Sequence, residues 1–260
     1  ENLSEGYRSY SDALIENTLT YDGKFGLNHI NTVVGQTFQR ELFHTLTGKG
    51  VNLPEPYYLQ VNNAEETSSA SNESEHVLAS YIGRLNYDFD QKYLISATVR
   101  RDGSSRLSSA DRWDWFPSIS AGWRIDRENF FPVAKTNINL LKIRGSYGVL
   151  GNENIGEYQY MDVMSRGNYT YSFGNNKVTG SAISNYVNTA IRWEKKKTVD
   201  LGVDLGMFNN QLEFTFDWYK STSEDLLYSV AVPTNAGATN GTVTMNAATM
   251  ENSGLEFLLA

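Results

Sequence analysis

Residues 77–89 alternate between apolar and polar side chains over a length well beyond that of an ordinary strand, which is about 5–6 residues. One set of positions is Val77, Ala79, Tyr81, Gly83, Leu85, Tyr87 and Phe89. A short turn at 90–92 follows, and the alternation resumes from Tyr93 to Val99. Because successive side chains of a strand point to opposite faces, this pattern predicts a long hairpin with one apolar and one polar face. Such hairpins, with aromatic residues near their ends, are typical of transmembrane β-barrels.

The same alternation predicts about nine antiparallel strands along the chain. They are expected near 13–21, 27–40, 77–89, 93–100, 113–125, 140–150, 198–208, 212–219 and 255–259. Tight turns are expected at 22–24, 90–92 and 209–210, and long loops at 41–75, 151–192 and 221–250. Short turns and long loops alternate along the chain, except that the two middle connections have intermediate lengths. Outer-membrane barrels have this polarity, whereas soluble sandwiches mix loop lengths.

The alternation also assigns side chains to two faces. The outward, lipid-facing set includes Val149, Val199, Leu201, Val203, Leu205, Phe214, Phe216 and Trp218. The inward set includes Arg84, Arg100, Arg124, Lys142, Arg144, Asp200, Asp204, Glu213, Thr215 and Asp217. Both signs of charge occur on the inward face, so we expect most of these groups to form ion-pair networks inside a barrel.

Composition excludes several other classes of protein. The formal net charge of −8 argues against a nucleic-acid partner, because phosphate binding requires a basic surface. The absence of cysteine excludes disulfides, thiolate metal sites and a cysteine nucleophile. The sequence has no run approaching the roughly 18 apolar residues of a membrane helix, and it opens without the pattern of a signal peptide.

The last predicted strand runs to the end of the chain, and an odd number of strands does not close the usual bacterial barrel. A sheet with lipid-exposed edges is not viable in a bilayer. We therefore expect residues 1–260 to be an internal part of one larger barrel domain.

Several short strings support this interpretation and occur in a consistent order. They are residues 81–88 (YIGRLNYD), 93–97 (YLISA), 100–106 (RRDGSSR), 116–124 (FPSISAGWR), 141–148 (LKIRGSYG), 202–206 (GVDLG) and 250–256 (MENSGLE). Together they make the chain resemble the SusC/RagA-type TonB-dependent outer-membrane transporters. The likeness covers most of the sequence apart from 41–75 and 157–190.

The resemblance implies an all-β fold: an antiparallel wall of about nine strands in a plugged transmembrane β-barrel of roughly 22 strands. The plug and the N-terminal domains would lie outside these residues. It further implies a place in the outer membrane of a Gram-negative bacterium, TonB-dependent uptake of oligosaccharides or peptides, and a SusD-like surface lipoprotein as partner. It implies no cofactor.

Two groups of residues are candidates for a site. The tyrosines Tyr158, Tyr160, Tyr169 and Tyr171 lie in a predicted extracellular loop, and tyrosine suits stacking on sugars or peptides. The other group is Arg101, Asp102, Gly103 and Arg106. For it we favour a structural role, in which Asp102 pairs with Arg106, Gly103 takes a positive φ and the serines cap the turn.

Alternatives to an importer are a passive porin, a soluble carbohydrate-binding β-sandwich and a β-rich hydrolase. Catalysis has little support in the sequence. The three histidines form no metal-binding pattern, and no Gly-x-Ser-x-Gly elbow is present. We therefore expect neither an enzyme nor a metal site.

Overall fold

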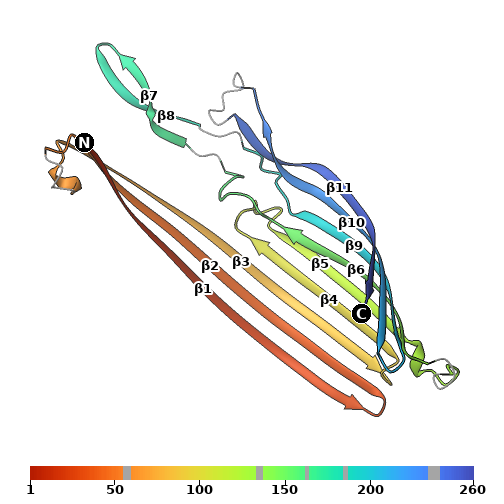
Figure 1. Cartoon of the computed structure of the whole chain (residues 1–260). Coiled ribbons are helices and arrows are strands. Elements are labelled where there is room, and N and C mark those ends of the chain that lie inside the picture. Colours follow the sequence, from red (N-terminus) through yellow and green to blue (C-terminus); the bar gives the residue numbers. More distant parts are fainter. Residues whose placement is uncertain (55–59, 133–136, 162–163, 184–186, 234–240) are drawn as a thin grey trace.

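The computed structural model is a long, curved, antiparallel β-sheet of nine strands, with a separate two-stranded hairpin at one end (Figure 1). It describes residues 1–54, 60–132, 137–161, 164–183, 187–233 and 241–260. The expected all-β fold is confirmed. No helix in these ranges is long and apolar enough to cross a membrane.

The strands follow the chain with two short 3-10 turns between them. The elements are β1 (Asn2–Phe25), β2 (Asn28–Val51), η1 (Val61–Asn63), β3 (Glu66–Phe89), β4 (Tyr93–Ser104), β5 (Trp113–Arg124), η2 (Ile125–Arg127), β6 (Ile138–Asn152), β7 (Met164–Phe173), β8 (Asn176–Ile183), β9 (Glu194–Met207), β10 (Leu212–Ala231) and β11 (Thr242–Leu259). The main sheet has the order β1-β2-β3-β4-β5-β6-β9-β10-β11, and β7 pairs with β8 alone.

The predicted loops are shorter than expected because several strands extend into them. β1 and β2 pair without interruption from Phe25↔Asn28 to Asn2↔Val51, and β2 and β3 continue to Val51↔Glu66. Residues 41–51 and 66–75, predicted as loop, are therefore strand, as is most of 221–250. The parts of these strands that lie away from the tight turns carry polar side chains on both faces. The alternation of apolar and polar residues that marks a strand is therefore missing there. The predicted loop 151–192 also contains the β7–β8 hairpin.

The turn between β1 and β2 lies at Gly26, three residues after the predicted position at 22–24. Gly26 has a φ of +58°, which a glycine adopts without steric cost. Gly23 is instead a strand residue, and a Cβ there would lie 2.5 Å from the Tyr21 hydroxyl. The other two predicted turns are confirmed, since Asp90, Gln91, Asn209 and Asn210 all have positive φ.

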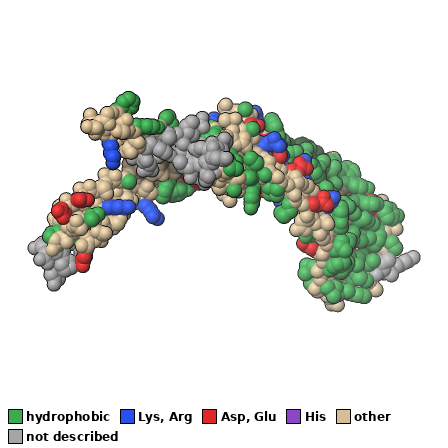
Figure 2. Space-filling view, turned by 90° about the horizontal axis from the view of Figure 1, so that it is seen from above, with side chains coloured by type: hydrophobic (Ala, Val, Ile, Leu, Met, Phe, Trp, Pro, Cys, Tyr) green, Lys and Arg blue, Asp and Glu red, His purple; other side chains and the backbone are tan. Residues whose placement is uncertain are grey.

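The two faces of the sheet differ as predicted. On the outward face, Leu201 is 53% exposed and pairs with Trp218, while Val203 pairs with Phe216. Figure 2 shows the hydrophobic side chains gathered along the convex side of the arch over the later strands. The sheet therefore presents an apolar band on its convex face without any second sheet covering it in the described part of the chain.

The connections lie at two ends of the sheet, and the tight turns are all at the same end (Figure 1). The turns at 26–27, 90–92 and 208–211, and the connection containing η2, lie at one end. The connections after β2, β4, β6 and β10 lie at the other, and we call that the loop end.

Candidate functional site

The concave face at the loop end carries the small hydrophobic core of the molecule. Its buried members are Leu107, Phe116, Val149, Ile191 and Trp193. The rings of Phe116 and Trp193 meet edge to face with centroids 5.3 Å apart, and the Trp193 indole N–H donates to the Arg112 carbonyl at 3.0 Å. Val149, predicted on the lipid-facing side, is buried here instead, because loop residues cover this part of β6. The core fixes the bases of two loops on the sheet.

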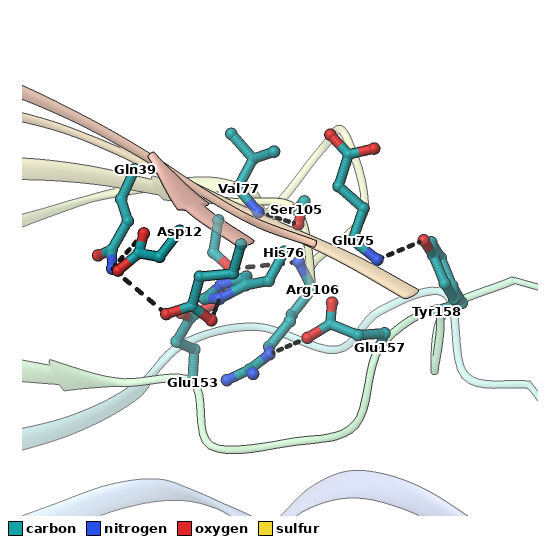
Figure 3. Close-up of polar contacts among 12 residues, drawn as sticks. Asp12, Gln39, Glu75, His76, Val77, Ser105, Arg106, Glu153, Glu157 and Tyr158 are labelled. Carbon is teal, nitrogen blue, oxygen red and sulfur yellow. Dashed lines mark hydrogen bonds and ion pairs between the residues drawn. The ribbon is translucent and has the colours of Figure 1, made fainter. Parts of the chain in front are cut away.

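A polar cluster beside this core docks residues 153–160 onto β3 and the β4–β5 loop (Figure 3). His76 Nε2 lies 3.1 Å from Glu153 Oε1, and His76 Nδ1 lies 3.5 Å from Glu41 Oε2. Arg106 Nε donates to Glu157 Oε1 at 2.7 Å. Burial raises the pKa of the Glu153 carboxyl, and attraction to His76 and Arg106 offsets only part of that effect. We call residues 153–160 the docked segment.

The docked segment also contacts β11, the strand at the opposite edge of the sheet from β1. The Tyr158 hydroxyl accepts a hydrogen bond from the Glu75 backbone N–H at 3.1 Å (Figure 3), and the Thr244 hydroxyl on β11 donates to Gln159 Oε1 at 2.9 Å. Consecutive residues of one segment therefore contact β3 and β11.

A second loop segment, 187–193, is tied to the last two strands. Arg192 forms a bidentate pair with Asp225 at 2.6 and 3.0 Å, and the Asn246 amide donates to the Arg192 and Asp225 carbonyls. The Arg192 hydrogen bond lowers the pKa of the Asp225 carboxyl. Both loop segments are thus held over the concave face by charged and amide contacts.

The structure brings the predicted tyrosines to the loop end but not into one cluster. Tyr158 is 39% exposed beyond its bond to β3, and Tyr160 is half-buried. Tyr171 is exposed on β7, where its ring lies over Gly180. Tyr169 pairs with Gly180 through the backbone, and its side chain lies outside the part of the chain that the structure describes.

The predicted contacts of the 100–106 motif are wrong, although Ser104 and Ser105 do hydrogen-bond backbone N–H groups there. Asp102 pairs with Arg100 at 2.6 Å, and Arg106 pairs with Glu157. Gly103 has no positive φ; a Cβ there would lie 2.5 Å from the Trp113 ring. Arg101 lies on the other face of the strand, against Trp113 and Trp115. The glycine is therefore needed for close approach rather than for a turn.

Nearer the turns, the concave face carries the expected ion-pair network. Arg144 lies 2.6 Å from Asp217 and 3.3 Å from both Asp200 and Asp204, and Lys142 lies 3.6 Å from Asp204. These groups partly line a depression of about 420 Å³ that extends across β2 to β9. Each acidic group has a cationic partner, so the network braces the wall.

The described residues contain no group of three or more acidic or histidine side chains that could hold a metal ion.

The contacts that hold the docked segment are not predictable from the sequence. His76 and Glu153 are 77 residues apart, and Glu75 and Tyr158 are 83 apart, so no local pattern connects them.

Comparison with known proteins places this geometry in a family. The family model described as TonB-dependent receptor-like β-barrel matches residues 2–260. TonB-dependent receptor P39 of Formosa agariphila is 34% identical over 263 residues, covering 100% of this chain and 25% of the relative. TonB-dependent receptor SusC of Bacteroides thetaiotaomicron is 34% identical over 243 residues, covering 91% and 23%.

A solved structure described as the RagAB peptide transporter is also similar, with a TM-score of 0.86 and 25% identity. The match covers 98% of this chain and 28% of that chain. The chain thus spans about a quarter of the length of the curated relatives it matches. On the family match, the identities and the shared sheet, the chain belongs to the TonB-dependent receptor β-barrel family, among relatives that include SusC.

Proposed function

We propose that the chain is part of the wall of an active importer in the outer membrane of a Gram-negative bacterium. The observation that carries this proposal is the two-faced sheet, with a continuous apolar band on its convex side and paired charges on its concave side. A bilayer accepts such a sheet only when its edges are paired. Further strands of the full-length protein would therefore close the barrel between β1 and β11, which form the two edges here.

The driving force and the partner follow from the relatives. The matched proteins are named TonB-dependent receptors, which supports energy transfer from TonB through parts of the protein outside these residues. The similarity to SusC and to the RagAB transporter supports a SusD-like lipoprotein over the loop end. The exposed β7–β8 hairpin, with Phe173 75% and Met164 66% exposed, offers apolar area for that contact.

The proposed substrates are oligosaccharides or peptides. The solved relative is described as a peptide transporter, which favours peptides, whereas the tyrosines suit either class. Tyr158, Tyr160, Tyr169 and Tyr171 remain our proposed substrate contacts. Beyond the hydrogen bond that its hydroxyl accepts from the Glu75 backbone N–H, the Tyr158 side chain is 39% exposed and is open to a substrate.

The proposal is tested with the full-length protein in its outer membrane. Uptake of labelled peptide and oligosaccharide pools is measured with and without the proton-motive force. A variant that replaces 164–183 by a short Gly-Ser linker removes β7 and β8, which in the described structure pair only with each other. We expect it to insert normally but to lose lipoprotein association or substrate capture.

Energy-independent uptake of both pools would contradict active import and favour a passive pore. Loss of membrane insertion with unchanged ligand binding in detergent would contradict the role given to the hairpin.

A further inference from the structure

Arg101 carries a positive charge on the convex face of the sheet, where the neighbouring side chains are apolar or aromatic. It pairs across the ladder with Tyr81 on β3 and Trp115 on β5. Its guanidinium carbon lies 5.1 Å from the Trp113 ring centroid and 5.3 Å from that of Trp115. The side chain is exposed, and within the described ranges no carboxylate pairs with it.

Other cations on the same face have acidic partners. Arg40 lies 2.7 Å from Glu75, and Lys220 lies 2.9 Å from Glu251. Among the described residues, Arg101 has only the two indole rings, which attract its charge but accept none of the five hydrogen bonds that a guanidinium can donate. Its donors are therefore free to bind a partner outside the described chain.

The height of Arg101 on the sheet matches the edge of a membrane. Tyr93, at the turn end of the same strand, lies eight residues away, which is about 27 Å along the strand. With a barrel tilt of 35–45° this gives a height of about 20 Å, close to the roughly 25 Å of an outer-membrane apolar band. The outward positions between them are apolar: Ala97, and Ile95 and Val99, which are each 43% exposed.

The aromatic residues around Arg101 are also of the kind found at the edge of a membrane's apolar band. Tyr81 and Trp113 stack with centroids 6.0 Å apart, and Trp115 is 55% exposed. Tryptophan and tyrosine concentrate where hydrocarbon meets headgroups, because their rings are apolar and their N–H and O–H groups are polar. Gly103 allows the approach of Trp113, since any Cβ at 103 would overlap that ring.

We propose that Arg101, with Trp113 and Trp115, forms a binding site for the phosphate of an outer-leaflet lipid headgroup. The planar guanidinium matches a phosphate in a bidentate arrangement, the indole rings hold it in place, and the acyl chains lie on the apolar band below. This inference rests on the proposed outer-membrane location but not on transport.

The test uses the full-length protein in detergent and monophosphoryl lipid A in mixed micelles as the probe. We expect Arg101→Gln to weaken binding about tenfold or more, because a charge-assisted contact is lost, and Arg101→Lys to weaken it less. Arg40→Gln is the matched control, an outward arginine that already has a carboxylate partner, and it should bind like the parent. Heat-dependent electrophoretic mobility reports that each variant is folded.

A second arm uses the same lipid with its phosphate removed, which should bind the parent as weakly as the phosphorylated lipid binds Arg101→Gln. Equal binding of both lipids by the parent would overturn the site, as would an Arg101→Gln variant that is folded and binds normally. Displacement of the lipid by millimolar inorganic phosphate would show a free-anion site and overturn the assignment to lipid. Uptake is measured separately, so its failure and that of the lipid site are distinguishable.

Discussion

Gly151 shows how a single position sets the packing at the loop end. A Cβ at 151 would lie 2.3 Å from the Phe116 ring, which is buried against Trp193 and has little room to move. We expect Gly151→Ala to destabilise the full-length protein by about 1–3 kcal/mol, as overpacked cores do. The measurement is the midpoint of unfolding in denaturant, followed by tryptophan fluorescence.

Gly83 provides the matched control for that experiment. It also lies in a strand of the main sheet, but a Cβ there would meet only Val99 at 3.7 Å, an ordinary contact. Gly83→Ala should leave the midpoint nearly unchanged. Equal losses in both variants would mean that glycine is needed for backbone conformation rather than for space at Phe116.

Single residues also mark where sequence reasoning failed. The Asp22-Gly23 dipeptide is a strong turn signal, yet the turn lies at Gly26, because β1 and β2 remain in register up to Phe25↔Asn28. Proximity in sequence predicts that Arg106 pairs with Asp102, but its partner in the structure is Glu157, which is 51 residues away. Tertiary contacts decide both cases, and a local pattern contains no information on them.

The docked segment is an element whose stability depends on pH. Glu153 faces His76 from β3, Arg106 from the β4–β5 loop and Glu157 from its own segment, and His76 also contacts Glu41 on β2. Because the pKa of Glu153 is raised on folding, the docked state binds more protons than the released state. Docking should therefore weaken as pH rises from the ordinary carboxyl pKa of about 4.3 through the raised value, and then level off.

Glu153→Gln tests this prediction, since the amide keeps a hydrogen-bonding group beside His76 without the charge. In the full-length protein, the rate of proteolytic cleavage within 153–160 should increase with pH for the parent. The variant should be cleaved more slowly than the parent at neutral pH, and its cleavage rate should depend less on pH. Glu73→Gln, an exposed change on β3, is the control. Slower cleavage of the parent at higher pH would contradict the predicted sign.

At the level of elements, the sequence predicts the strands well near the turn end of the sheet and poorly near the loop end. The outward positions alternate strictly where one face is apolar, and the strands predicted at 198–208 and 212–219 are observed within β9 and β10, apart from residue 208. The polar continuations, such as 66–75, extend because each strand completes the backbone ladder of its neighbour. Backbone pairing leaves no pattern in the side chains, which is why the sequence predicts loops at those residues.

For the whole molecule, the two faces of the sheet should respond differently to the same substitution. Leu201 lies outward in the apolar band, and Thr215 lies inward opposite Asp204. We expect Leu201→Arg to cost about 2–4 kcal/mol of folding free energy in a bilayer, as arginine does near the midplane of a barrel's lipid face. Thr215→Arg should cost much less, because its charge lies on the polar concave face rather than in lipid.

The comparison is made by folding both full-length variants into lipid vesicles and titrating the folded fraction with denaturant. Equal costs, or a larger cost for Thr215→Arg, would contradict the assignment of the convex face to lipid.

The docked segment has a mechanical consequence for the molecule as a whole. β3 and β11 are six strand spacings apart, about 29 Å along the sheet, yet Tyr158 and Gln159 contact them from adjacent positions. The segment therefore acts as a tie across an arch and fixes the curvature of the wall at its loop end. The turn end has no such tie in the described residues, so a ligand that displaced the whole docked segment would let the rim spread while the base kept its width.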